Sequence, residues 1–269
     1  MIVKRIFILC CALPLFGSVA AQRPDAEAEY LRADSALWTS YEAAMREIYE
    51  GEEQGRHERA RALYDTTMRR NRELALRYAA TPSGLQRCYM TRLGMPKDSL
   101  RAALRRIPRR MRRSPYGRSI ALHLRTHQLT EGDRAVVLGG WREADGKPFD
   151  WSSLREGYTL LLYGGLDCMG ASGREYLAGL AARYPDDLRI VVFWPTDSRE
   201  RLAQKRASYP ALLHRAVSDF RGDHTPFKIR YGAQGTPTCF LIDPDRRIRV
   251  KSGGLAPQRI EEVLSETKK

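Results

Sequence analysis

The fold is decided by the stretch Tyr231-Gly-Ala-Gln-Gly-Thr-Pro-Thr-Cys-Phe-Leu-Ile-Asp-Pro-Asp245. In it a Gly-Thr-Pro turn leads directly into a short apolar run, Thr238 to Ile242, which ends at an Asp-Pro turn. A second run, Ile248 to Lys251, follows that turn. Two such runs on either side of a turn rich in Asp and Pro predict a pair of strands joined as a hairpin.

The sequence before the hairpin alternates strands with helices. Tyr158 to Tyr163 is a continuous apolar run, as expected for a strand buried on both faces. In chain order we expect that strand, a helix over Arg174–Tyr184, a strand over Leu188–Trp194, a helix over Ser198–His214, the hairpin, and a last helix over Pro257–Thr267. This order predicts an α/β sandwich in which a mixed sheet is flanked by helices.

The first half of the chain has a different periodicity. From about Asp25 to His127 the apolar residues recur at helical spacing, and no strand pattern occurs. Helix starts are marked by Thr81-Pro82, Met95-Pro96 and Ser114-Pro115. We predict four or five amphipathic helices over residues 22–128 and the α/β domain over residues 129–269, and we expect the second part to fold alone.

The chain begins with the pattern of an export signal. Lys4 and Arg5 precede a continuous apolar segment, Ile6 to Phe16, and small residues stand before a cleavage point after Ala21. This pattern predicts a signal peptide over residues 1–21 and export to the periplasm. Lipid anchoring at Cys10 is the alternative, but Leu9 stands where lipid attachment requires a small residue.

The composition is strongly basic. The chain has 46 Lys and Arg against 32 Asp and Glu, a formal net charge of +14. Nine arginines lie between Leu100 and Arg125 with no acidic residue among them. Nucleic acid is the usual partner for such a charge, but an exported protein seldom meets it. We therefore expect no nucleic acid partner and consider an anionic membrane surface bound by arginines 101–125, with a merely solvated charged face as the alternative.

Three segments resemble the thioredoxin fold, and in particular the periplasmic TlpA/ResA-like thiol–disulfide oxidoreductases. They are Asp145-Gly-Lys147 with the residues up to Gly157, Leu160-Leu-Leu-Tyr-Gly-Gly-Leu-Asp-Cys168, and the Gly-Thr-Pro-Thr and Phe-Leu-Ile-Asp motifs of the opening stretch. The resemblance covers about residues 131–269. It implies a thioredoxin-like sandwich, with Cys168 as the nucleophile at a helix N-terminus, where unpaired N–H groups favour the thiolate. It also implies a cis bond before Pro237, with Thr236 holding an extended protein thiol or disulfide substrate.

The sequence departs from the family at the second cysteine. The family has Cys-x-x-Cys, and here Cys168 is followed three residues later by Ala171. A mixed disulfide at Cys168 would therefore have no neighbouring thiol to resolve it. Cys239 is a candidate remote resolving thiol, although a buried core residue is the simpler interpretation. Asp167, where the family often has Trp, would disfavour the thiolate.

These observations leave two functions open. One is thiol–disulfide chemistry with Cys168 as the sole nucleophile, and the other is a non-catalytic binding or adaptor module at the cell envelope. We expect Cys88 to be a packing residue. His123 and His127 lie four residues apart, but no further ligand is visible nearby, so we expect no metal and no cofactor.

Overall fold

The computed structural model describes residues 25–136, 138–154, 156–210 and 214–266. The export signal predicted for residues 1–21 lies outside them. Among the described residues, no helix combines the length and the apolar character needed to cross a membrane.

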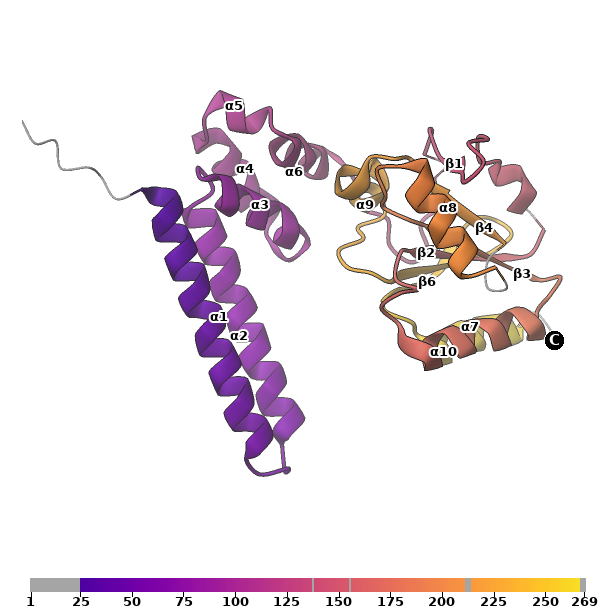
Figure 1. The fold of residues 1–269 in the computed structure, drawn as a ribbon, viewed down its shortest axis with the longest axis horizontal. Helices are drawn as coiled ribbons and strands as arrows, with labels where there is room; N and C mark the ends of the chain where they lie inside the picture. The colour runs from indigo at the N-terminus through magenta and orange to yellow at the C-terminus, as the bar shows by residue number, and fades with distance from the viewer. Residues whose placement is uncertain (1–24, 137, 155, 211–213, 267–269) are drawn as a thin grey trace, which may run out of the picture.

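The described part of the N-terminal region contains helices and no strands, as expected, but it has six α-helices where four or five were predicted (Figure 1). Its elements are α1 (Ala26–Glu50), α2 (Arg56–Arg77), α3 (Pro82–Thr91), the 3₁₀ turn η1 (Arg92–Gly94), α4 (Lys97–Arg106), α5 (Arg109–Arg112) and α6 (Pro115–Arg125). Side chains cap three of the helix starts: Asp25, Thr81 and Ser114 accept backbone N–H bonds at α1, α3 and α6. Such caps satisfy N–H groups that have no partner within the helix.

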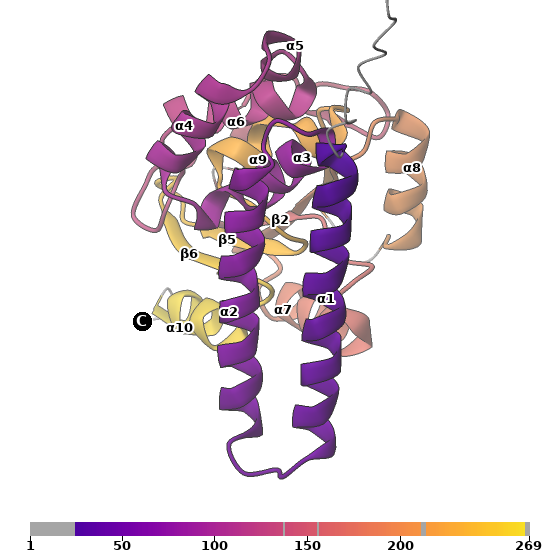
Figure 2. The same cartoon turned by 90° about the vertical axis from the view of Figure 1, so that its left-hand side faces the viewer.

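The first two helices form a long antiparallel hairpin that projects from the molecule, while α3 to α6 gather at its other end (Figures 1 and 2). The apolar core of this region lies among α2, α3, α4 and α6, where Leu85, Tyr89, Leu100 and Ile120 are buried. In α1 only Tyr30 is buried. The far part of the hairpin is therefore held by the contact between its two helices rather than by a shared core.

The second half is a mixed sheet flanked by helices, which confirms the predicted fold class. Its elements are β1 (Arg142–Glu143), η2 (Trp151–Leu154), β2 (Tyr158–Tyr163), α7 (Gly170–Arg183), β3 (Leu188–Phe193), α8 (Arg199–Ser208), β4 (Arg215–Ser218), η3 (Gly222–His224), α9 (Pro226–Arg230), β5 (Thr238–Ile242), β6 (Ile248–Gly253) and α10 (Pro257–Ser265). The described strands pair in the order β1-β4-β3-β2-β5-β6. Strands β2, β3 and β4 run parallel, and β1, β5 and β6 pair antiparallel with their neighbours.

The central strand β2 separates two apolar cores, because successive side chains of a strand point to opposite faces. Leu160 and Leu162 pack with α7, α8 and α10 on one face. Leu161 and Tyr163 pack on the other face with Trp141 and with Phe227 of α9. All of β2 is buried, as its continuous apolar run predicts.

Several element boundaries differ from the sequence prediction. Helix α7 starts at Gly170, four residues before the expected start at Arg174. The helix expected up to His214 ends at Ser208, because Tyr209 precedes Pro210 and a residue before proline is pushed out of the helical region. Strand β4, of four residues, begins directly after the span predicted as helix and was not predicted.

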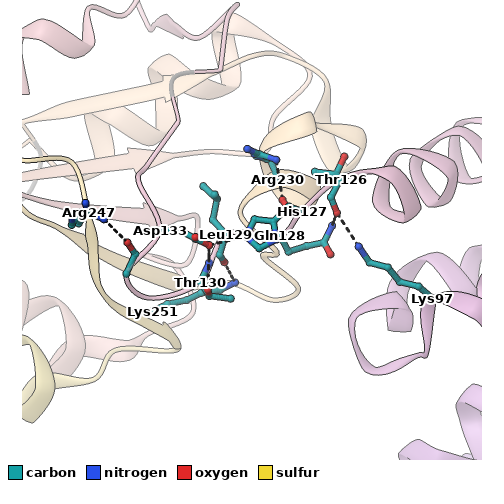
Figure 3. Close-up of polar contacts among 11 residues, drawn as sticks. Lys97, Thr126, His127, Gln128, Leu129, Thr130, Asp133, Arg230, Arg247 and Lys251 are labelled. Atoms are coloured by element: carbon teal, nitrogen blue, oxygen red, sulfur yellow. Dashed lines mark hydrogen bonds and ion pairs between the residues drawn. The ribbon is translucent and has the colours of Figure 1, made fainter.

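A linker over residues 126–133 joins the two halves and is fixed by backbone contacts (Figure 3). Its Leu129 is 2% exposed, donates its N–H to Arg230 O at 2.9 Å, and accepts from Lys251 Nζ at 2.7 Å. At its end, Gly132 N–H donates to Ile248 O at 2.8 Å, and Ile248 N–H donates to Asp133 O at 2.9 Å. The linker thus lies along the outer edge of β6.

A second contact between the halves surrounds Arg92, whose side chain is 0% exposed. Its guanidinium donates to Lys228 O and Ala233 O at 3.4 and 3.3 Å, and it lies 4.5 Å from the centre of the Tyr89 ring. The Tyr89 hydroxyl donates to the backbone oxygen of Asp223. Helix α3 and η1 therefore contact η3 and the end of α9 directly.

Candidate active site

Cys168 lies in the turn between β2 and α7 and is exposed. Its backbone N–H donates to Gly165 O at 3.0 Å, and Met169 N–H donates to the same oxygen at 3.1 Å. The turn is also held from its side by Arg174, whose guanidinium donates to Leu166 O at 3.2 Å. The thiol is thus accessible on a turn whose backbone is fixed.

The loop before β5 lies against this turn. The Thr236–Pro237 peptide bond is cis, as the family resemblance implies. Thr236 is exposed, and its Oγ1 lies 4.0 Å from Cys168 Sγ. The structure therefore brings together the thiol and the residue that the sequence analysis assigned to substrate binding, although they are 68 residues apart in the chain.

Two glycines that the sequence analysis did not assign to the site make this approach possible. A Cβ at Gly165 would lie 2.4 Å from Pro237 Cβ and 2.5 Å from its nitrogen, and one at Gly164 would lie 2.9 Å from Thr236 Cγ2. Gly165 also has a φ of 93°, which favours glycine. A pair of glycines directly after a buried strand is the signal that indicates such a close approach.

The carboxylate of Asp167, next to the thiol, is held by α8 and by the residue after it. Its two oxygens accept from Lys205 Nζ at 2.7 Å and from the Tyr209 hydroxyl at 2.8 Å. The Lys205 ammonium lowers the pKa of Asp167, with the Tyr209 hydrogen bond adding to the effect. The negative charge that was expected to oppose thiolate formation is therefore paired with a cation at the site.

A groove runs along the Thr236–Pro237 edge, and a separate cavity lies beside α8. A groove of about 780 Å³ is lined by residues 235–238, by the end of β6 from Lys251 to Gly254, and by Thr130 and Glu131. The linker thus supplies part of the groove lining through Thr130 and Glu131. On the α8 side, Lys205 and Pro195 line a cavity of about 570 Å³.

The other two described cysteines are buried and unbonded. Cys239 is 0% exposed in β5, opposite Leu162 and Ser252, and burial raises the pKa of its thiol to about 12. Burial likewise raises the pKa of Cys88 in α3 to about 12. Ala171, at the position for which the resemblance implied a second cysteine, is exposed in the first turn of α7. Within the described residues, Cys168 is the exposed thiol.

The two histidines do not share a helix face. Helix α6 ends at Arg125, so His123 is buried in it while His127 lies in the linker and contacts Asp133 at 2.9 Å. Across the described ranges, no group of three or more His, Cys, Asp and Glu is arranged to hold a metal ion.

No family model and no curated protein matches the sequence. Among solved structures, this chain is similar to a thiol-disulfide oxidoreductase from Bacteroides fragilis NCTC 9343, at 17% identity over 51% of this chain and 99% of that one, with a TM-score of 0.42. It is also similar to a thioredoxin-like protein from Parabacteroides distasonis ATCC 8503, at 17% identity over 52% of this chain and 98% of that one, with a TM-score of 0.39. Identities this low concern the fold alone.

Proposed function

We propose that this protein is an exported thiol–disulfide exchange protein of the TlpA/ResA type that uses Cys168 as its only nucleophile. The observation that carries the proposal is the exposed Cys168 thiol 4.0 Å from Thr236 Oγ1, beside the cis bond to Pro237. A thiol placed for chemistry must be accessible, whereas Cys88 and Cys239 are enclosed in apolar cores.

The reaction proceeds by exchange at sulfur. The Cys168 thiolate attacks one sulfur of a substrate disulfide, a mixed disulfide forms, and the other substrate sulfur leaves as a thiolate. Because Ala171 offers no thiol, an external thiol must then attack the adduct, which releases Cys168 and leaves a disulfide between that thiol and the first substrate sulfur. The groove along residues 235–238 would hold the extended substrate chain during both steps.

The test is formation of a mixed disulfide by the purified protein with a small aromatic disulfide. Peptide mapping should find the adduct at Cys168, while Cys88 and Cys239 in the folded protein stay unmodified because they are buried. The Cys168→Ser variant should form no adduct at these three positions. Reduction of a protein disulfide should need added glutathione for each turnover. Glutathione-independent turnover that survives Cys168→Ser would overturn the assignment.

A non-catalytic binding module is the second candidate. It is favoured by the exposed Ala171 in the place of the second cysteine, which leaves the groove in place but removes the local redox pair. If Cys168 in the folded protein reacts with neither alkylating agents nor disulfides while the protein still binds unfolded peptides, this second function is the correct one.

Export is part of the proposal and is tested separately. It rests on the signal-peptide pattern of residues 1–21. N-terminal sequencing of the protein from a periplasmic fraction should give Gln22 as the first residue. Recovery only from the cytoplasm with Met1 retained would contradict export.

A further inference from the structure

Nine arginines of α4, α5, α6 and the turn between α5 and α6 form one exposed set of side chains, which we call the arginine face. Every one of them is exposed. Of these nine, Arg101 alone forms an ion pair with another described residue, Asp98. The arginine face consists of Arg101, Arg105, Arg106, Arg109, Arg110, Arg112, Arg113, Arg118 and Arg125.

The scaffold beneath the arginine face is fixed. Helices α4 and α6 bury Leu100, Ala103 and Ile120 in the core of the helical region, so their arginines stay on the outer side. Prolines set the starts of α5 and α6, because their fixed φ suits a helix start. The positive side chains are therefore displayed on ordered helices rather than on a tail.

The position of these helices leaves them accessible to a flat surface. Helices α4, α5 and α6 gather at the end of the helical region opposite the loop between α1 and α2, and α5 lies at the extremity in both views (Figures 1 and 2). The α/β domain lies to one side of them in Figure 1 rather than over α5. A large planar partner can thus reach α5 before it meets the domain.

The guanidinium groups of the arginine face favour a partner that carries phosphate groups. Guanidinium groups bind phosphate oxygens through two parallel hydrogen bonds, and they are more weakly hydrated than ammonium groups. Crowded cations with few acidic partners repel one another, and a surface with many negative charges relieves that repulsion. A bilayer of anionic lipids offers phosphates over a plane, and each nearby basic residue strengthens binding about fivefold.

We propose that the arginine face docks this protein on the phosphate headgroups of an anionic phospholipid bilayer. The proposal does not depend on Cys168, because the face is built from α4 to α6 and shares no residue with the groove. It assigns a role to the helical region, which carries neither the thiol nor the cis-proline loop.

The experiment is co-sedimentation of the full protein with vesicles of phosphatidylcholine alone and of phosphatidylcholine mixed with phosphatidylglycerol. One variant replaces four arginines around α5, and a matched control replaces four exposed arginines of α2, so that both lose the same charge. The test variant is Arg109→Gln, Arg110→Gln, Arg112→Gln and Arg113→Gln, and the control is Arg61→Gln, Arg69→Gln, Arg70→Gln and Arg77→Gln.

The wild-type protein should bind the mixed vesicles and not those of phosphatidylcholine alone, and binding should weaken as salt rises. The test variant should bind about 100-fold more weakly or worse, and the control should stay within about tenfold of wild type. Equal weakening of both variants would overturn the proposal, because net charge alone would then explain binding. Binding to a DNA duplex without binding to the mixed vesicles would overturn it in favour of nucleic acid.

Discussion

Replacing Gly165 by alanine would place a methyl group against the cis-proline loop. The added Cβ would lie 2.4 to 2.6 Å from three atoms of Pro237, two of which belong to the backbone. A flexible side chain could move away, but the Pro237 nitrogen and Cα cannot move without displacing the loop itself. We expect the Gly165→Ala variant to separate Thr236 from Cys168.

The Gly165→Ala substitution lowers the unfolding free energy for two separate reasons. The first is the left-handed backbone at Gly165, with a φ of 93°, which an alanine adopts at a cost of about 1–2 kcal/mol. The second is the clash with Pro237, an overpacking cost of roughly 1–3 kcal/mol. The variant should therefore lose about 2–5 kcal/mol of unfolding free energy.

Gly140→Ala is the matched control, because Gly140 has a φ of 89° and an added Cβ there meets nothing within 4 Å. It should show the backbone cost alone, so Gly165→Ala should melt lower than Gly140→Ala by a few degrees to about 10 °C. Mixed-disulfide formation with a peptide disulfide should slow in Gly165→Ala and stay unchanged in the control. Equal melting temperatures and equal adduct rates in the two variants would refute the reasoning.

Three further predictions concern the thiol, the contact between the halves and acid stability. Ala171→Cys should supply a second thiol that can form a disulfide with Cys168, so reductase turnover should need less added glutathione. Turnover equal to that of the wild-type protein would contradict this prediction. In urea melts, Arg92→Ala should lower the unfolding free energy by about 2 kcal/mol more than Arg92→Met does. The reason is that Arg92 is among the largest fully buried side chains, and methionine refills most of its space. Equal losses in the two variants would show that the hydrogen bonds of Arg92 dominate. Burial lowers the pKa of His123 to about 4. The folded protein therefore keeps this imidazole neutral, and roughly 3 kcal/mol of unfolding free energy that is present above pH 6.5 is lost as the pH falls towards 4. His123→Gln should flatten the loss of stability over that range, and an unchanged slope would assign the loss to other groups.

The sequence predicts the interior of the sheet better than its edges. Strands β2, β3 and β5 are short and mostly apolar, and such runs have few alternatives to a buried strand. The edge elements are short: β1 has two residues and β4 has four, and their pairing depends on neighbours that no local pattern specifies. The predicted strand Leu188–Trp194 accordingly differs from β3 by one residue, whereas no local pattern predicts β4.

At the candidate active site, too, residues in local sequence motifs could be predicted, and residues brought in by long-range packing could not. The Gly-Thr-Pro-Thr motif and the cysteine after β2 could be recognised because each is a local pattern, and the structure places Cys168 and Thr236 together. Lys205 and Tyr209 could not be assigned, because their contact with Asp167 spans about 40 residues and depends on the packing of α8. Whether residues 129–269 fold alone stays a prediction.

The linker along β6 has a consequence for self-association. An uncovered edge strand is a template on which a second chain can add a strand and begin to aggregate. Here the Ile248 N–H and C=O are already bonded to Asp133 and Gly132, and the opposite edge is only the two residues of β1. A fragment that starts at Leu129 keeps this cover with the sheet, whereas one that starts after Asp133 leaves β6 open to a neighbouring molecule.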